Sequence, residues 1–319
     1  MSEKAFATID IGTNTTLLLV GRAAAGGAVE VLAERAEITR LGRGIGTTGV
    51  LGSAGIDATL DVLRDYARIA RAHRATIAAI GTEGLRRAKN ARDFLDPARE
   101  ILGSAVEVID GEREAALTFR AVAESFPAET GAGSVAVIDI GGGSTEIIVA
   151  ERGVVRLRTS LQIGSVRLTE RHMHGDPPRA EEIAAVRAEI AGALAPVAEL
   201  SSAKHTHLVG VAGTVTSLAA MTQQLASYDP ARVHGFHLTR AALDGEIARL
   251  AHATQAEREK FVGLDPRRAD VLLAGALILQ AIAARAGVDA ILVSDRGIRW
   301  GLLYELLARS EPSAPSSSS

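Results

Sequence analysis

The sequence of 319 residues contains no cysteine and few aromatic side chains. The lack of cysteine excludes disulfide bonds, thiolate metal sites and a cysteine nucleophile, and it is compatible with a reducing cytosol. Because Phe, Trp and Tyr make up only 3% of the residues, the hydrophobic core has to be built from Ala, Val, Ile and Leu. The shares of hydrophobic (47%) and charged (23%) residues are ordinary for a globular protein, and the length favours two domains.

Signals for export and membrane insertion are also missing. The N-terminus leads directly into a strand-like segment at residues 5–10, without the basic and long apolar regions of a signal peptide. No run of 18 or more uncharged apolar residues occurs, so we expect no membrane span and a cytoplasmic protein. The formal net charge of −3 disfavours nucleic acid as a partner. The Ser- and Pro-rich residues 311–319 are expected to form a disordered tail.

The most informative feature is an internal repeat. Residues 10–20 read DIGTNTTLLLV, and residues 139–149 read DIGGGSTEIIV. Each copy follows a short apolar run, and the order of strand, glycine-containing turn and second strand is typical of a β-hairpin. Two matched hairpins far apart in one chain predict two domains of the same architecture, related by duplication.

The remaining segments alternate between helix and strand, which indicates an α/β fold. The loop at 126–133 carries Pro and Gly and predicts a boundary between domains at 1–125 and 126–310. Apolar spacing predicts helices at 54–72, 112–125, 179–201, 214–224, 270–286 and 298–307, and strands at 76–81, 105–109, 207–212 and 290–294.

The two glycine turns have the composition of phosphate-binding loops. Glycine lets backbone N–H groups approach a phosphate closely, and the neighbouring hydroxyl groups add donors. A phosphate would repel the aspartates that precede the turns, Asp10 and Asp139, unless they hold a divalent cation that bridges to it. A pair of ordinary β-hairpins is the alternative, and the Asp present in both copies argues against it. Glu146 replaces Leu17 of the first copy and either faces the same cleft or is an exposed strand residue.

Other polar motifs stand where strands give way to helices, and each has two interpretations. Residues 81–90 either bind an anion at a helix N-terminus or form a solvated helix face. The acidic residues of 110–115 either stabilise a helix start or supply a general base. Residues 210–217 form another glycine turn with hydroxyl groups, a candidate phosphate or nucleotide contact. Residues 293–301 either line the site or cap the last helix. The histidines at 172, 174, 205 and 207 are interpreted as surface residues.

Taken together, these motifs resemble the exopolyphosphatase / guanosine pentaphosphate phosphohydrolase (Ppx/GppA) family over residues 5–309. Besides the two repeats, the resemblance rests on LRRAKN at 85–90, GEREA at 111–115, GTVTSLA at 213–219, RVHGFHLT at 232–239, RADVLLAG at 268–275 and SDRGIRWGLL at 294–303. It implies two ribonuclease-H-like domains of the actin-like ATPase superfold with a cleft between them. The last helix, 298–309, is a candidate to pack back on the N-terminal domain, and the family also leads us to expect a homodimer.

The resemblance also implies roles for individual residues. Glu114 matches the general base, and Asp10, Asp139 and Glu146 match the groups that organise Mg²⁺ or Mn²⁺. The phosphate contacts that the resemblance implies are Arg86 and the second turn, Gly141, Gly142, Gly143, Ser144 and Thr145. The composition of the other two glycine turns adds Gly12, Thr13, Asn14, Thr15, Gly213 and Thr214 as candidates.

Two positions depart from the family pattern. Arg113 replaces the first Glu of a Glu-Glu pair, and its charge is expected to favour the ionised form of Glu114. Trp300 stands where the family commonly has Glu, so that end of the cleft is expected to differ. The resemblance also leads us to expect a short-form member, without the helical C-terminal extension of longer members.

The expected activity is release of terminal orthophosphate from inorganic polyphosphate. Hydrolysis of guanosine pentaphosphate is the alternative within the family, and nothing in the sequence separates the two, although no aromatic platform for a base is apparent. From another class, a non-catalytic sensor of polyphosphate or alarmone is also open, since a fold does not fix a function.

Overall fold

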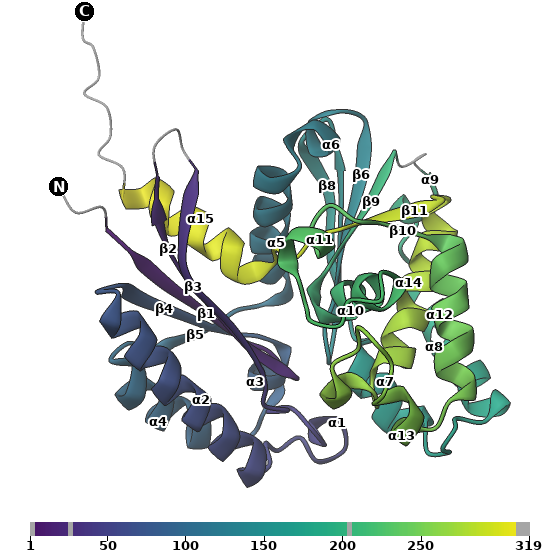
Figure 1. The fold of residues 1–319 in the computed structure, drawn as a ribbon, viewed down its shortest axis with the longest axis horizontal. Helices are drawn as coiled ribbons and strands as arrows, with labels where there is room; N and C mark the ends of the chain where they lie inside the picture. Colours follow the sequence, from purple (N-terminus) through teal and green to yellow (C-terminus); the bar gives the residue numbers. More distant parts are fainter. Residues whose placement is uncertain (1–3, 25–27, 203–205, 311–319) are drawn as a thin grey trace, which may run out of the picture.

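The computed structural model describes residues 4–24, 28–202 and 206–310, which form two lobes that lie side by side (Figure 1). The expected disordered tail, 311–319, and His205 lie outside the described residues. Within the described ranges, no helix has the length and apolar character needed to cross a bilayer.

The first lobe is built on a five-stranded sheet with the order β3-β2-β1-β4-β5. Three antiparallel neighbours come first in the chain, and two strands parallel to β1 follow. The strands are β1 (Phe6–Ile11), β2 (Thr15–Ala23), β3 (Val29–Ile38), β4 (Thr76–Gly81) and β5 (Val106–Val108).

The second lobe repeats this order in a six-stranded sheet, β10-β11-β9-β6-β7-β8. Here β6, β7 and β8 form the antiparallel part, β9 runs parallel to β6 and β11 parallel to β9, and β10 adds an antiparallel edge. The strands are β6 (Ser134–Ile140), β7 (Thr145–Glu151), β8 (Val154–Leu161), β9 (His207–Val211), β10 (His237–Thr239) and β11 (Ala290–Val293). The shared strand order confirms an α/β protein of two ribonuclease-H-like halves.

Helices cover the sheets with their apolar faces. In the first lobe, α2 (Ser53–Ala72) buries Leu60, Leu63 and Ala67 at helical spacing, and α4 (Arg92–Leu102) packs beside it. In the second lobe, α14 (Leu272–Ala286) is buried on nearly all sides. Around it lie α7 (Ser165–His172), α8 (Ala180–Leu194), α10 (Ala212–Thr222) and α12 (Arg240–His252). Shorter helical turns are α1 (Ile45–Thr48), α3 (Glu83–Arg87), α6 (Pro127–Gly131), α9 (Glu199–Ser202), α11 (Pro230–Val233), α13 (Gln255–Arg258) and the 3₁₀ turn Pro266–Arg268.

Two helices connect the lobes. Helix α5 (Gly111–Ser125) buries Ala115 and Val122 against the second sheet, although it precedes that sheet in the chain. Helix α15 (Ile298–Ser310), at the end of the described chain, buries Leu303 and Leu307 against β1 and β2 of the first sheet. The two helices also pack against each other (Figure 1). The boundary predicted at residue 125 assigns α5 to the first domain. In the structure, α5 instead packs on the sheet of the second lobe.

Most expected elements are present, and the differences have local causes. The expected helix at 179–201 ends at Leu194, because Pro196 cannot continue a helix, and a separate turn, α9, follows. The edge strand β3 was not predicted. Its residues are exposed or only partly buried, so its sequence lacks the apolar alternation that marks a half-buried strand.

Candidate active site

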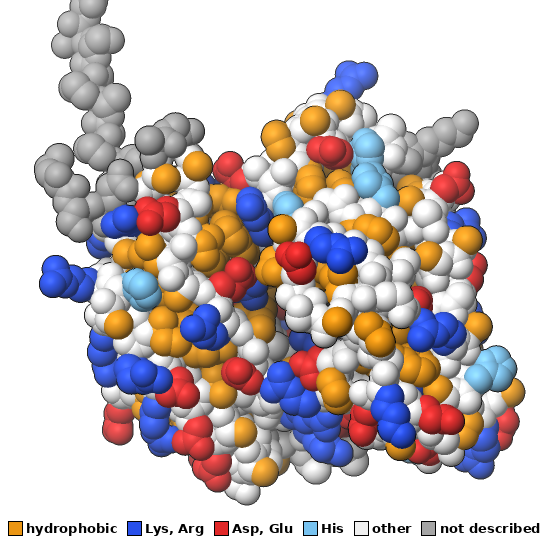
Figure 2. Space-filling model, viewed as in Figure 1, with side chains coloured by type: hydrophobic (Ala, Val, Ile, Leu, Met, Phe, Trp, Pro, Cys, Tyr) orange, Lys and Arg blue, Asp and Glu red, His pale blue; other side chains and the backbone are white. Residues whose placement is uncertain are grey.

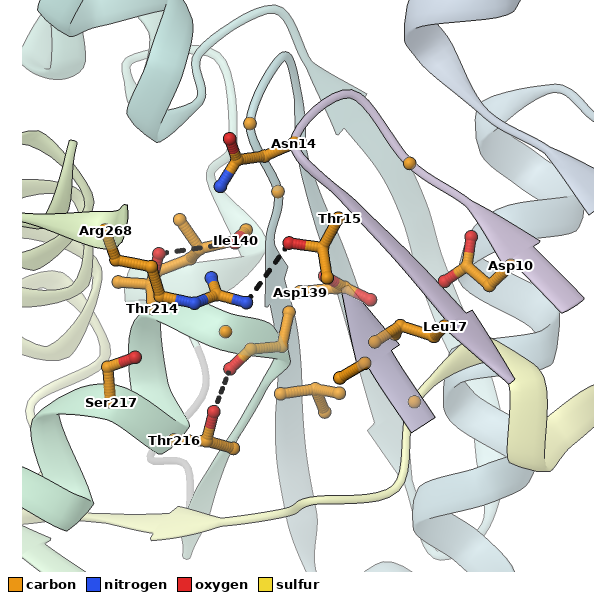
Figure 3. A pocket seen from close by; sticks show the side chains of 18 of the residues that line it. Asp10, Asn14, Thr15, Leu17, Asp139, Ile140, Thr214, Thr216, Ser217 and Arg268 are labelled. Atoms are coloured by element: carbon orange, nitrogen blue, oxygen red, sulfur yellow. Dashed lines mark hydrogen bonds between the residues drawn. The ribbon is translucent and has the colours of Figure 1, made fainter. Parts of the chain in front are cut away.

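A cavity of about 690 Å³ lies between the lobes, and residues of both line it. Figure 2 shows the surface hollowed along the line where the lobes meet. All three predicted glycine turns contribute to the wall, as do Asp10, Asp139 and Glu114. Figure 3 shows Asp10 and Asp139 projecting from their strands beside this space.

The two repeated turns have the same backbone geometry. In the first turn, the Gly12 amide donates to the Thr15 carbonyl at 3.0 Å; in the second, the Gly141 amide donates to the Ser144 carbonyl, also at 3.0 Å. The strand registers match as well, because Asp10 pairs with Leu17 and Asp139 with Glu146. The repeat seen in the sequence is therefore a repeat of structure.

The turns also face each other across the junction of the lobes. A Cβ atom on Gly142 would come within 3.2 Å of the Thr13 Cβ, and one on Gly143 within 3.2 Å of the Thr13 hydroxyl. A Cβ on Gly143 would moreover lie 2.0 Å from a carboxylate oxygen of Glu83 on α3. Glycine is therefore required here, because it alone lets the two loops approach this closely.

Five buried carboxylates lie beside the turns: Glu83, which pairs with Arg87 and Arg167, and the predicted site residues Asp10, Glu114, Asp139 and Glu146. One oxygen of Asp10, of Glu114 and of Glu146 has no hydrogen-bond partner. Burial and then the Asp139 charge raise the pKa of Asp10 to about 7 and that of Glu146 to about 8. Burial raises the pKa of Asp139 to about 6. For Glu114, burial and the neighbouring Glu146 raise the pKa well above its usual value.

This donor set fits a hard divalent cation in its chemistry. Mg²⁺ and Mn²⁺ prefer oxygen ligands, and unpartnered buried carboxylate oxygens are costly without a cation. Among the described residues, however, no group of three or more acidic or histidine side chains is close enough to enclose an ion. Water molecules would therefore have to complete the coordination, as is usual for Mg²⁺. His172 contacts Glu189 instead and takes no part in such a group.

The raised pKa values predict how the metal-free protein responds to pH. Between about pH 4 and pH 8, the folded protein keeps protons that the unfolded chain has lost, so the free energy of unfolding falls as pH rises. We expect at least about 1 kcal/mol of stability to be lost between pH 5.5 and pH 8 in the presence of a chelator. Denaturant unfolding at the two pH values measures this. Equal or greater stability at pH 8 would contradict the expectation.

Glu114 lies in the first turn of α5, where the Asp110 side chain caps the helix by accepting from the Arg113 amide at 2.8 Å. The Glu114 carboxylate lines the cavity, and Arg86 Nη1 lies 3.9 Å from Glu114 Oε2. Arg86 also donates to the Ile109 carbonyl and is not part of the cavity wall. The structure thus places Arg86 beside the predicted base, and a phosphate contact by Arg86 stays a prediction.

Two other predicted residues stand behind the wall. Thr145 is fully buried, and its hydroxyl group donates a hydrogen bond to the Ile163 carbonyl at 2.7 Å. Glu146, opposite Asp139 in the hairpin, accepts from the Ser160 hydroxyl at 2.7 Å. Thr145 therefore supports the turn from inside, whereas Glu146 acts on the site through its charge beside Asp139.

The cavity wall contains three arginines that were not singled out from the sequence, Arg35, Arg268 and Arg299. Arg268, from the second lobe, donates to the Thr15 hydroxyl of the first turn at 3.1 Å, as Figure 3 shows. Its guanidinium covers Gly213, where a Cβ atom would lie 2.0 Å from Nη1. The motif RADVLLAG at 268–275 contains this arginine, but no local pattern indicated that it reaches the other lobe.

The expectations for the two departures are corrected by the structure. The Arg113 guanidinium binds Glu305 rather than Glu114, and the pKa of Glu114 is raised, not lowered. Arg86 is the cation that opposes this rise. Trp300, a residue of α15, is only 5% exposed and belongs to a cluster with Ala121 of α5 and with Phe6 and Leu19 of the first sheet, outside the cavity wall. Both departures therefore alter helix packing and not the lining of the cleft.

The duplicated sheet and the paired turns at its cleft define an enzyme of the actin-like ATPase superfold that acts on phosphate groups. Comparison with known proteins gives the family: the pattern of the Ppx/GppA phosphatase family matches residues 19–310, and the chain belongs to that family. Membership makes the chain a phosphoric anhydride hydrolase.

Three relatives illustrate the match. Exopolyphosphatase 2 of Mycobacterium tuberculosis is 36% identical over 94% of this chain and 98% of that protein. A guanosine-5'-triphosphate,3'-diphosphate pyrophosphatase of Photobacterium profundum is 30% identical over 95% of this chain and 59% of that protein. The crystal structure of the Aquifex aeolicus Ppx/GppA family member is 35% identical, covers 97% of this chain and 99% of its own, and superposes with a TM-score of 0.81.

Proposed function

We propose that this protein releases terminal orthophosphate from inorganic polyphosphate, with Glu114 as the general base. The observation that carries the proposal is the pair of matched glycine turns facing each other beside a buried carboxylate with a free oxygen. The exopolyphosphatase among the relatives supports polyphosphate as the substrate.

In this proposal the terminal phosphoryl group lies between the two turns. Backbone amides and the hydroxyl groups of Thr13, Thr15 and Ser144 donate to its oxygens, and Arg268 adds a positive charge. Such donors stabilise the charge that develops in the transition state. Water attacks the terminal phosphorus while the bond to the bridging oxygen breaks, and the shortened chain leaves as a phosphate anion. Glu114 takes the proton of the attacking water.

The proposal includes Mg²⁺ or Mn²⁺, which Asp10 and Asp139 would hold with water completing the coordination, while Glu146 adds negative charge from behind the cavity wall. When bound, the ion supplies positive charge to the phosphate oxygens. The ion would also offset the repulsion between the buried carboxylates, which water cannot screen inside the protein.

A phosphate-release assay tests the activity itself. The wild-type chain would be incubated with polyphosphates of several lengths and with guanosine pentaphosphate, with and without Mg²⁺. We expect orthophosphate from polyphosphate, released from chain ends and dependent on the cation. Tight binding of these ligands without any release would instead establish the non-catalytic sensor.

Guanosine pentaphosphate remains the second candidate substrate, because the structure supplies an aromatic side chain that the sequence did not reveal as part of the site. Tyr228 is 50% exposed and lines the cavity beside Leu225 and Ala226. The cavity wall also carries both signs of charge, the acidic residues Glu34, Asp265 and Asp295 and the basic residues Arg35, Arg268 and Arg299. A base that stacks on the ring and donates N–H groups would find acceptors in these carboxylates.

A substitution at Tyr228 separates the two substrates. Because stacking on an aromatic ring contributes about 1–3 kcal/mol per base, Tyr228→Ala is expected to lower kcat/KM for guanosine pentaphosphate by about tenfold or more. The same variant should stay within about twofold of wild type on polyphosphate, and Tyr228→Phe, which keeps the ring, should resemble wild type on both. Equal losses on both substrates would rule out a base-specific role.

A further inference from the structure

The helix that carries Glu114 is anchored to the other lobe through the residue next to Glu114. Arg113 Nη1 donates to Glu305 Oε2 at 2.8 Å, and Arg113 Nη2 donates to Glu305 Oε1 at 2.7 Å. Arg113 belongs to α5, which lies on the second sheet, and Glu305 belongs to α15, which lies on the first. A two-point contact of this kind fixes orientation as well as distance, because the planar guanidinium and the carboxylate must align.

Further contacts hold α5 and α15 close together. A Cβ atom on Gly301 of α15 would lie 2.0 Å from the Leu117 carbonyl oxygen of α5, so the two backbones are in direct contact. Trp300 fills the same interface, covered by the Arg296 guanidinium at 4.3 Å. Arg120 of α5 donates to the Tyr304 carbonyl at 3.2 Å. The two positions that depart from the family pattern, Arg113 and Trp300, thus belong to one contact between the lobes.

We propose that Arg113 is a positioning residue: its ion pair with Glu305 holds the first turn of α5 in the rotation that points Glu114 into the cleft. The inference rests on the proposed role of Glu114 as base. The Asp110 cap holds the backbone of this turn, since it accepts from the Arg113 amide. The cap makes no contact with the first lobe, which carries Arg86 and the Gly12 turn. The Arg113–Glu305 pair ties this first turn to α15, one helical turn before the Leu117–Gly301 contact.

The proposal is tested by combining Arg113→Ala with Glu114→Gln. Small misplacements of a catalytic group cost up to about 100-fold in rate, so Arg113→Ala alone is expected to lower kcat about 10- to 100-fold with little change in KM. In the Glu114→Gln background, the same change should alter the residual rate less than about twofold, because the group that Arg113 positions is already gone. The charge swap Arg113→Glu with Glu305→Arg should restore part of the lost rate.

Matched controls separate positioning from folding. Arg309→Ala removes another arginine that binds Glu305, at 2.8 Å, without a contact to α5, and should leave kcat unchanged. Circular dichroism gives the folded fraction of each variant, and Glu305→Gln replaces Arg113→Ala if the latter does not fold. An unchanged kcat in Arg113→Ala, or an equal loss with and without Glu114, would overturn the proposal. Wild-type turnover in Glu114→Gln alone would instead reject the proposed base.

Discussion

Replacing Glu114 by Gln is expected to lower the rate of phosphate release from polyphosphate by about 10²–10⁴-fold, the usual effect of removing a general base. Gln keeps the size and polarity of the side chain but cannot accept the proton of the attacking water. The carboxylate stands in the first turn of α5 with one oxygen free and lines the cleft between the paired turns. The variant should still bind polyphosphate, because the glycine turns and Arg268 are unchanged.

A neighbouring glutamate provides the control for this experiment. Glu112 lies in the same helical turn but is exposed and does not line the cavity, so Glu112→Gln should retain wild-type kcat. Phosphate release and polyphosphate binding would be measured on the same preparations. A Glu114→Gln protein that turns over like wild type would remove Glu114 from the proposed role, whereas one that neither binds nor folds would call for Glu114→Asp in its place.

The second large effect is expected on removal of the divalent cation. If Mg²⁺ or Mn²⁺ supplies several kcal/mol of charge stabilisation, chelation should lower phosphate release by about 100-fold or more, and the cation should restore it. Glu146→Gln should raise the half-saturating cation concentration by about 10- to 100-fold, as substitutions that support a metal site do. The measurement is activity as a function of free cation concentration.

Glu146→Gln also tests whether the buried charge of Glu146 lowers the stability of the metal-free protein. Burial and the Asp139 charge raise the pKa of Glu146 to about 8, so at pH 8 this group destabilises the fold when no cation is present. The metal-free Glu146→Gln protein should therefore unfold at a higher temperature than metal-free wild type at pH 8, even though it is less active. Full activity in chelator, or a less stable variant, would contradict the assigned role.

The parts of the fold that follow local patterns could be predicted from the sequence. The repeat of Asp-Ile-Gly predicted two similar hairpins, and the registers pair Asp10 with Leu17 and Asp139 with Glu146. The turns, their aspartates and Glu114 all lie at the cleft, since each stands at the end of a strand or the start of a helix. Such positions are marked by a change of periodicity that one sequence already shows.

The parts that depend on contacts between distant segments could not be predicted. Arg268 reaches Thr15 across the lobes, and nothing in its neighbourhood indicates that partner. The sequence suggested that Arg113 acts on its neighbour Glu114, whereas the side chain binds Glu305, 192 residues away. Nothing in the sequence around Tyr228 distinguishes it from other aromatic residues in loops, and only the fold places it on the cavity wall. The first two contacts depend on how α5, α15 and the 3₁₀ turn Pro266–Arg268 pack, and the place of Tyr228 depends on the loop between α10 and α11. Spacing along the chain does not encode either arrangement.

A crystal structure with Mg²⁺ and orthovanadate, which adopts the geometry of a phosphoryl group under attack, tests the proposed mechanism most directly. We expect the vanadate between the Gly12 and Gly141 turns, with an apical oxygen within hydrogen-bonding distance of the Glu114 carboxylate. Vanadate bound on another surface, or a Glu114 side chain directed away from it, would contradict the proposed mechanism.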